Sequence, residues 1–309
     1  VHARVGEEES HRMMANYDGV IIWDLPSAVR NRYLKYCFSH SIRCYISPKI
    51  SDIILMGSDR IHLFDTPLLM SRNMGLSIDQ RAAKRLLDIL VSGVGIILTS
   101  PIMLIIAIAV KAYDRGPVFY FQDRLTLHGR EFKICKFRSM CVDSEKNGAR
   151  LASKHDSRIT PVGNVLRNLH LDELPQLFNV FKGDMSLVGP RPERKTIMEE
   201  YEKELPEFYY RLKVKAGLTG YAQVYGKYNT TPYDKLKLDL FYIENYSFLL
   251  DIKLIFMTVK IFFQKEVSEG VDDRQINALK TSGAEKISDT AEVPELMKDP
   301  DSRGEKKYE

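Results

Sequence analysis

The chain has 309 residues, enough for one large domain or two smaller ones. Hydrophobic residues make up 44% and charged residues 28% of it, so most of the chain has the composition of a folded protein. The formal net charge of +4 is too small to indicate a nucleic-acid-binding protein. A local excess of positive charge would still favour an anionic membrane surface.

The cysteines show no metal-binding pattern: Cys37, Cys44, Cys135 and Cys141. None forms a CxxC pair and no histidine stands at zinc spacing, so we expect reduced thiols in a protein that faces the cytosol. The first ten residues are polar and acidic and do not read as a signal peptide. Because the sequence starts at Val1 rather than at a methionine, we expect a truncated or naturally shortened protein.

Residues 17–76 alternate short apolar runs with helical patches. Strands are predicted at 20–23, 41–46 and 61–64, and a helix at 26–39. This order is typical of part of an α/β domain. No glycine-rich phosphate loop is present, so a structural or regulatory role is favoured over a nucleotide site.

An apolar run occupies residues 86–110, in which Asp88 is the only charged residue. As a straight helix it would measure roughly 37 Å, long enough to cross a bilayer. Ser100 and Pro101 stand in its middle. Proline removes a backbone donor and clashes with the preceding turn, so we expect a bend there, with the Ser100 hydroxyl bonding a freed carbonyl.

Basic residues flank this run on both sides: Arg72, Arg81, Lys84 and Arg85 before it, and Lys111, Arg115 and Arg124 after it. Lysine and arginine favour the cytoplasmic side of a membrane. The sequence therefore favours a re-entrant helix, broken at Ser100-Pro101, that enters and leaves by one face. A straight membrane span and a buried helix of a soluble protein remain alternatives.

Downstream, residues 117–137 predict a small β-hairpin that turns at His128-Gly129. Residues 164–182 look helical, and Pro175 should kink or restart that helix. Residues 234–263 interleave apolar residues with lysines and carboxylates, which predicts either core helices or a helix lying in the membrane interface.

An acidic pair, Asp172 and Glu173, stands within Leu171-Asp172-Glu173-Leu174-Pro175-Gln176-Leu177. A carboxylate is ionised at neutral pH and can attack an activated phosphorus without a partner base. A divalent cation and nearby arginines would offset its repulsion by an anionic diphosphate. Magnesium typically takes one or two carboxylates plus phosphate oxygens, so one acid can attack while the other holds the metal. Helical neighbours point about 100° apart, which disfavours the facing carboxylates of a glycosidase.

Arg191 follows Gly189 and lies between two prolines, so its backbone is stiff and its guanidinium is aimed in advance at a phosphate. Further candidate phosphate ligands are Lys136, Arg138 and Arg167, for each of which a surface salt bridge is the simpler explanation. His170 precedes the acids by two residues. A packed histidine is favoured there over one that tunes the carboxylates.

From about residue 84 to 263 the chain resembles the bacterial sugar transferases, which are monotopic polyprenyl-phosphate phosphoglycosyl transferases. The resemblance rests on ordered blocks: the apolar run with Ser100-Pro101, Lys136 to Met140, Asp156 to Thr160, Leu171 to Leu177, Gly183 to Pro192, and Gly217 to Gln223. Two positions depart from the family pattern. Thr126 stands where glycine is frequent, and Ala216 where proline is frequent.

The resemblance implies an α+β, mostly helical monotopic membrane enzyme with a re-entrant helix and a small β-hairpin. Residues 1–76 would be a partial Rossmann-like segment, as in larger members that carry further transmembrane helices upstream. Residues 77–266 would be the membrane-associated catalytic domain. Residues 267–309 are charged and poor in aromatic residues, and read as a disordered tail.

The resemblance also implies an activity: transfer of a sugar-1-phosphate from a UDP-sugar to a polyprenyl (undecaprenyl) phosphate, with release of UMP. Asp172 would attack and form a phosphosugar ester, Glu173 would hold Mg²⁺ together with Asp172, and Arg191 and Arg167 would bind phosphate. The reaction would initiate exopolysaccharide, capsule or O-antigen synthesis at the cytoplasmic face of the bacterial inner membrane. Membrane lipid would be a partner and nucleic acid would not; a homo-oligomer remains open.

Two other classes of function are alternatives to the enzyme. A membrane-attached regulatory or scaffold homologue would keep the fold without turnover, which the intact Asp172, Glu173 and Arg191 disfavour. A soluble phosphohydrolase is disfavoured by the apolar run at 86–110.

Overall fold

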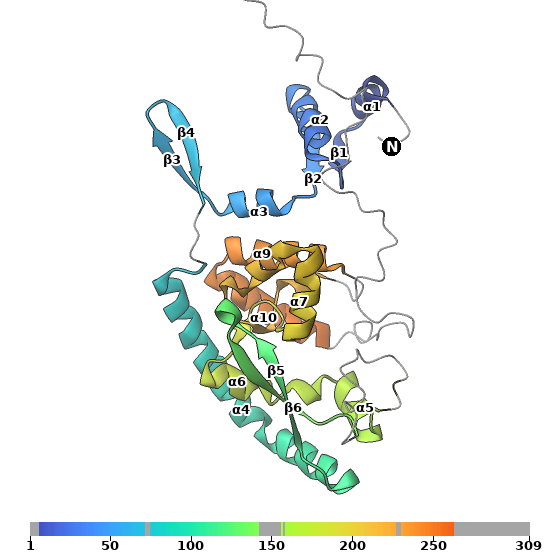
Figure 1. The fold of residues 1–309 in the computed structure, drawn as a ribbon, viewed down its shortest axis with the longest axis vertical. Coiled ribbons are helices and arrows are strands. Elements are labelled where there is room, and N and C mark those ends of the chain that lie inside the picture. The colour runs from blue at the N-terminus through green and yellow to red at the C-terminus, as the bar shows by residue number, and fades with distance from the viewer. Residues whose placement is uncertain (1–5, 72–74, 142–155, 157, 227–229, 263–309) are drawn as a thin grey trace, which may run out of the picture. The chain divides into compact units, whose positions relative to one another are not determined.

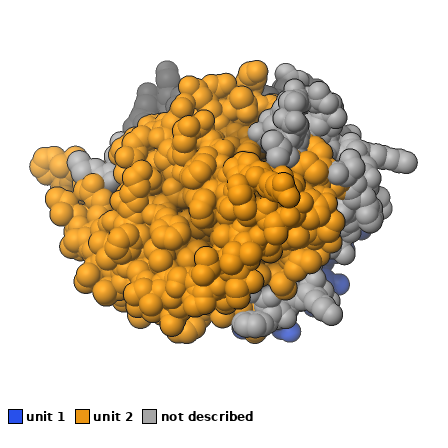
Figure 2. Space-filling model, turned by 90° about the horizontal axis from the view of Figure 1, so that it is seen from below, with its two compact units in different colours: residues 1–48, 283–309 blue, residues 49–282 orange. Residues whose placement is uncertain are grey.

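The computed structural model describes residues 6–71, 75–141, 156, 158–226 and 230–262. These residues belong to two compact units, one ending at Pro48 and the other beginning at Lys49 (Figures 1 and 2). The division predicted from the sequence, into an N-terminal segment at 1–76 and a catalytic domain at 77–266, stays a prediction. The charged tail predicted at 267–309 lies outside the described residues.

The smaller unit is a short βαβ element preceded by a helix. Its elements in chain order are α1 (Glu7–Met14), β1 (Gly19–Ile22), α2 (Ser27–Ser39) and β2 (Arg43–Ile46). Strands β1 and β2 pair in parallel, as a crossover through a helix requires. Ile22, Val29 and Tyr33 form its core. The strands and the helix predicted in this region are confirmed.

The larger unit begins with α3 (Ile50–Met56) and an antiparallel hairpin of β3 (Asp59–Leu63) and β4 (Thr66–Met70). Helix α3 packs against α9 (Pro232–Glu244). The strand predicted at 61–64 is therefore confirmed, but it pairs with β4 rather than with the strands of the smaller unit.

Helix α4 (Ile78–Asp114) contains the whole apolar run. It begins at Ser77, whose side-chain oxygen accepts a hydrogen bond from the Gln80 N–H. One stripe of α4 is buried along its full length: Lys84, Asp88, Ser92, Met103, Ile106 and Val110. The opposite face is apolar and open, with Ile97 and Leu98 each 72% exposed. Within the described residues, α4 is the one helix long and apolar enough to cross a membrane.

The helix continues through Pro101 instead of ending there. Because proline has no N–H, the Ile97 carbonyl loses its usual partner four residues on. The Ser100 hydroxyl donates to that carbonyl at 2.8 Å, which confirms the expected compensation. Figure 1 shows α4 changing direction partway along its length.

Both ends of α4 pack on the same unit. Near its start, Lys84 forms an ion pair with Asp251 of α10 (Phe248–Phe262) at 2.6 Å. Near its end, Met103, Ile106 and Val110 join a second apolar cluster. The two ends of the apolar run are therefore fixed to one body.

The predicted β-hairpin is confirmed. Strands β5 (Phe119–Leu125) and β6 (Glu131–Phe137) are antiparallel, with Phe119 opposite Phe137. The turn between them is the 3₁₀ segment η2 (Leu127–Gly129), in which His128 has φ +58° and Gly129 has φ +75°.

The region predicted as one helix at 164–182 is three elements: α5 (Pro161–Asn168), the 3₁₀ turn η3 (Leu171–Glu173) and α6 (Gln176–Lys182). The restart after Pro175 is confirmed. The acidic pair, however, lies in the 3₁₀ turn and not in an α-helix. His170 adopts a left-handed conformation (φ +54°) after α5, and this separates the pair from the helix before it.

A parallel strand pair, β7 (Ser186–Val188) and β8 (Gly217–Thr219), contacts α4, α6 and α10, and helical segments make up the remaining elements. They are α7 (Lys195–Glu204), the 3₁₀ segment η4 (Pro206–Lys213), α8 (Tyr221–Tyr225), α9 and α10. In α10, Leu254 is fully buried whereas Leu249 and Phe256 are more than 70% exposed. In the C-terminal region α9 is therefore a core helix, and α10 has one buried face and one open apolar face; a position of α10 in the membrane interface stays a prediction.

The two departures from the family pattern meet in space. The Ala216 N–H donates to Thr126 Oγ1 at 3.2 Å, and the Thr126 hydroxyl donates to the Asp184 carbonyl at 3.1 Å. A proline at 216 would have no N–H to donate, and a glycine at 126 would have no hydroxyl to accept. The Thr126 hydroxyl and the Ala216 N–H are therefore partners of each other.

This coupling predicts a non-additive stability change. Thr126→Val should cost about 1–3 kcal/mol, because the buried Ala216 N–H loses its acceptor. Adding Ala216→Pro should recover part of that loss, since no donor then remains unsatisfied. Thermal unfolding of the detergent-solubilised protein measures both effects, with Thr126→Ser as the control that keeps the hydroxyl. A double variant whose loss equals the sum of the single losses would contradict the coupling.

Candidate active site

The acidic pair lies on η3, where β6, α5 and the loop after β7 converge. Glu173 Oε1 accepts hydrogen bonds from Lys136 Nζ of β6 at 2.6 Å and from Arg191 Nη2 at 2.9 Å. Burial by itself would raise the pKa of Glu173, but the charges of Arg191 and Lys136 outweigh it and hold this pKa far below its usual range. Glu173 therefore stays ionised and holds the side chains of Lys136 and Arg191 in place.

Asp172 has a different environment. Within the described residues its carboxylate accepts no hydrogen bond and forms no ion pair. Burial raises its pKa and the neighbouring charge of Glu173 raises it further, while Lys136, Arg167 and His170 lower it. Asp172 is thus an unpaired carboxylate in a field of cations, a state suited to a nucleophile.

Arg167, at the end of α5, has one unsatisfied donor. Its Nη1 is buried and has no hydrogen-bond partner in the described part of the chain. Buried guanidinium donors are costly when unpaired, so this atom is a candidate donor to an anion, although Arg138 and Arg211 also carry a buried guanidinium nitrogen without a hydrogen-bond partner there. Since Arg167 also acts electrostatically on Asp172, that anion would lie beside the acidic pair.

Asn179 of α6 sets the position of Lys136, and the sequence reasoning missed it. Its Nδ2 donates to the Lys133 carbonyl at 2.8 Å, and its Oδ1 accepts from the Cys135 N–H at 2.9 Å. The Asn179 side chain thus makes the two hydrogen bonds to β6 that a neighbouring strand would make. These bonds position β6 so that Lys136 reaches Glu173. The sequence contains one signal for this role. Asparagine has a low helix propensity, so its presence inside a short apolar helix indicates that its side chain has a structural task.

The backbone around Arg191 is held by close glycine contacts. The Gly189 N–H donates to the Thr219 carbonyl at 2.8 Å, and the Gly217 N–H donates to the Pro190 carbonyl at 2.9 Å. A Cβ on Gly217 would approach the Gly189 nitrogen to 2.1 Å. Side chains at these positions would push the strands apart and displace the arginine.

Of the predicted site residues, the structure brings together Asp172, Glu173, Lys136, Arg167 and Arg191. Arg138 pairs instead with Asp114 at the end of α4. Ser100 and Pro101 lie in the middle of α4, away from either of its ends.

A divalent cation at this site would need substrate oxygens. No group of three or more acidic, histidine or cysteine side chains that could hold a metal ion is found among the described residues. The open Asp172 carboxylate nevertheless fits Mg²⁺, which usually combines one or two carboxylates with phosphate oxygens and water. Since Glu173 Oε1 already accepts from two cations, Asp172 is the more available of the two predicted ligands.

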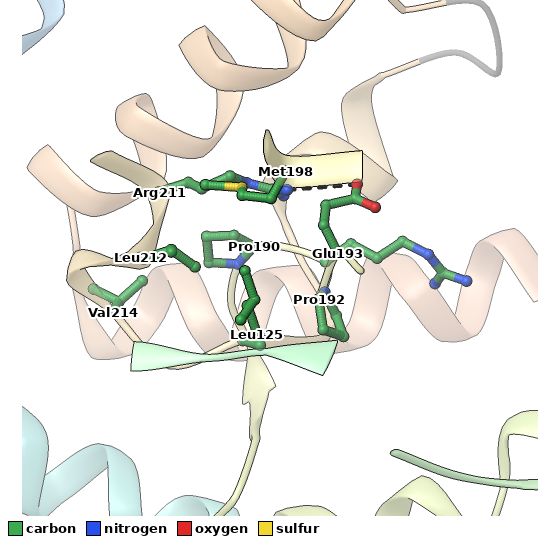
Figure 3. A pocket seen from close by; sticks show the side chains of 10 residues that line it. Leu125, Pro190, Pro192, Glu193, Met198, Arg211, Leu212 and Val214 are labelled. Carbon is green, nitrogen blue, oxygen red and sulfur yellow. Dashed lines mark ion pairs between the residues drawn. The ribbon is translucent and has the colours of Figure 1, made fainter. Parts of the chain in front are cut away.

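A small pocket lies behind the arginine segment (Figure 3). Leu125, Pro190, Pro192 and Met198 contribute to its wall, and the ion pair between Arg211 and Glu193 borders it. Its enclosed volume is about 10 Å³, far less than the roughly 300–1,000 Å³ of typical small-molecule sites. The pocket is therefore not a site for a nucleotide sugar.

The charges around Asp172 predict how catalysis depends on pH. Activity should rise with pH as Asp172 loses its proton, at a pH above the ordinary aspartate value because burial and Glu173 raise its pKa. Arg167→Gln removes a charge that lowers this pKa, so the acidic limb should move to higher pH. The pH dependence of kcat measures the shift, with the exposed Lys203→Gln as the control. An unmoved limb in Arg167→Gln would contradict the assignment.

Comparison with known proteins adds independent findings. The sequence profile of the bacterial sugar transferases matches residues 79–265. An Aeromonas hydrophila UDP-N-acetylgalactosamine-undecaprenyl-phosphate N-acetylgalactosaminephosphotransferase is 46% identical over 57% of this chain and 43% of its own length. A Klebsiella pneumoniae UDP-glucose:undecaprenyl-phosphate glucose-1-phosphate transferase is 44% identical over 66% and 43%.

A Salmonella typhimurium undecaprenyl-phosphate galactose phosphotransferase is 35% identical over 72% of this chain and 49% of its own length. The chain thus spans less than half the length of these relatives. The matched region contains α4 from its second residue, the hairpin and all five converging side chains. With more than half of its residues inside the family profile, this chain belongs to the bacterial sugar transferases.

Proposed function

We propose that this chain transfers a sugar-1-phosphate from a UDP-sugar to a polyprenyl phosphate and releases UMP. The observation that carries the proposal is the unpaired Asp172 carboxylate, surrounded by the charges of Lys136, Arg167 and Arg191. The names of the relatives, which describe undecaprenyl-phosphate sugar phosphotransferases, support the same substrates.

The first step would form a covalent intermediate. An Asp172 oxygen attacks the phosphorus that bears the sugar, and the bond from that phosphorus to the bridging oxygen breaks. UMP leaves with the bridging oxygen, and the sugar phosphate remains as an ester on Asp172. A phosphate oxygen of the polyprenyl phosphate then attacks the same phosphorus and releases Asp172 as a carboxylate.

The surrounding side chains would supply positioning and charge. Arg191 and Lys136, held in place by Glu173, face the diphosphate, and the open Nη1 of Arg167 donates to one of its oxygens. Bound Mg²⁺ would neutralise part of the diphosphate charge. Removal of divalent cations by a chelator should therefore stop turnover, and added magnesium should restore it.

The open face of α4 suits insertion into one leaflet of a membrane. Its apolar side chains are exposed, while both of its ends are fixed to one catalytic unit. A transmembrane crossing would place those ends on opposite sides. We therefore propose a re-entrant helix, with the site on the cytoplasmic face where UDP-sugars are present.

This topology predicts that positions before and after the apolar run have the same accessibility. Ala82→Cys and the native Cys141 are both exposed, and each can be the single thiol of a variant that otherwise lacks cysteine. A membrane-impermeant maleimide should label both in inverted vesicles and neither in intact cells. Labelling of the two thiols from opposite sides would mean that α4 spans the bilayer.

The proposed activity is tested by UMP release from purified protein with magnesium, undecaprenyl phosphate and a panel of UDP-sugars. UDP-glucose, UDP-galactose and UDP-N-acetylgalactosamine cover the sugars that the relatives are named for. One donor should give UMP and a lipid-linked sugar phosphate in equal amounts. A panel without UMP release would favour the scaffold alternative.

A further inference from the structure

Two carboxylates that take no part in the proposed chemistry, one buried and one largely buried, hold the segment that carries Arg191. Asp88 lies in the apolar run of α4 and is 3% exposed. Glu193 follows Arg191 by two residues, and its side chain is 13% exposed. Buried carboxylates are retained at a cost unless they are fully paired, so the partners of each one indicate its role.

Asp88 holds the start of the segment. Its Oδ1 accepts from the Ser186 hydroxyl at 3.0 Å and from the Leu187 N–H at 2.8 Å. Both donors belong to β7, whose pairing with β8 runs through Ser186 and Val188. The carboxylate therefore lies at the edge of β7 that does not pair with β8. There it accepts the backbone hydrogen bond that a further strand would accept.

A second contact joins the same part of α4 to β7. Lys84, one turn before Asp88, donates to Asp251 at 2.6 Å and to the Tyr242 hydroxyl at 3.0 Å. The Tyr242 hydroxyl donates to Asp251 Oδ1 at 2.8 Å and lies 3.3 Å from the Val188 carbonyl. The base of the apolar helix is thus bonded through Asp88 to the strand that leads directly to Arg191, and it lies close to this strand through Lys84 and Tyr242.

Glu193 holds the end of the segment. Its carboxylate accepts from Lys235 of α9 and lies 3.5 Å from Arg211 Nη1 of η4 and 4.0 Å from Arg124 Nη1 of β5. Figure 3 shows Glu193 facing Arg211 at the pocket behind the segment. Burial alone would raise the pKa of Glu193, but Lys235 and Arg211 lower it to about 2. The anchor is therefore ionised throughout the neutral range.

We propose that Asp88 and Glu193 are positioning residues that together hold Arg191 on Glu173. Between these two anchors the Arg191 side chain is 46% exposed, yet its Nη2 lies 2.9 Å from Glu173 Oε1. Fixing the backbone at both ends limits the positions that this open side chain can reach and so favours its contact with Glu173. The same bonds tie the membrane-facing helix to the phosphate-binding arginine.

This inference rests on the proposed function, and a double-variant cycle tests it. Asp88→Asn and Glu193→Gln should each lower kcat for UMP release about tenfold or more, with smaller changes in KM. In an Arg191→Gln background neither should lower kcat by more than about twofold further, because no arginine is left to position. Exposed carboxylates give the matched controls, Asp79→Asn on α4 and Glu199→Gln on α7. Losses that multiply with that of Arg191→Gln would overturn the proposal.

Hydrogen exchange gives a readout that does not depend on turnover. The amides of Leu187 and Gly189 should exchange about tenfold faster in both variants than in the wild type, and the controls should match the wild type. If Glu193→Gln does not fold, Glu193→Asp keeps the charge, shortens its reach and should show the same acceleration. Wild-type protein that releases no UMP would overturn the proposed function alone. Unchanged exchange would overturn the positioning role alone.

Discussion

Asp172→Asn is expected to reduce UMP release by about a thousandfold or more. The amide has nearly the same shape as the carboxylate, but it is neutral and a poor nucleophile toward phosphorus. Because Asp172 makes no hydrogen bond or ion pair within the described residues, its replacement should leave the surrounding contacts intact. The thermal midpoint of the variant should therefore stay near that of the wild type.

The matched control is Asp123→Asn, at an exposed position on β5, which should keep wild-type turnover. Wild-type protein given the UDP-sugar without lipid acceptor should gain the mass of a sugar phosphate on the peptide that contains Asp172. Peptide mass spectrometry after rapid acid quenching measures this adduct. Turnover that persists while Asp172 stays unmodified would rule out the covalent route.

Glu173→Gln is expected to lower kcat by about a hundred- to a thousandfold. The substitution removes the negative charge that Lys136 and Arg191 share, at 2.6 and 2.9 Å from the same oxygen. Without it the two cations repel each other and lose their common acceptor, so the diphosphate loses its prearranged partners. Steady-state UMP release over a range of donor concentrations measures the effect.

A pH measurement distinguishes the loss of this anchor from general damage. Glu173 raises the pKa of Asp172, so the residual activity of Glu173→Gln should have its acidic limb at lower pH than the wild type. Arg167→Gln should shift the limb in the opposite direction. Glu131→Gln, in an exposed ion pair with Lys195, is the surface control. If Glu173→Gln keeps the kcat of the wild type, catalysis does not depend on the positions in which Glu173 holds Lys136 and Arg191.

Local patterns were sufficient for much of the fold. The apolar run, the hairpin turn at His128-Gly129 and the helix restart after Pro175 each depend on residues close together in sequence, and the structure contains all three. The acidic pair was assigned to an α-helix because the apolar spacing around it is helical. Its 3₁₀ turn follows from the left-handed His170, a conformation that propensity does not reveal for a non-glycine residue.

The sequence by itself determined which residues could do the chemistry: an acidic pair, a proline-framed arginine and an apolar segment with basic flanks. Only the tertiary structure decided how they act. It placed Lys136 and Arg191 on Glu173 rather than on Asp172, and gave Arg138 to Asp114. It also placed the carboxylates of Asp88 and Glu193 at opposite ends of one segment, as its anchors. The reason is that an ion pair depends on distances of a few ångströms between elements far apart in the chain, which residue types and spacing along one segment do not encode.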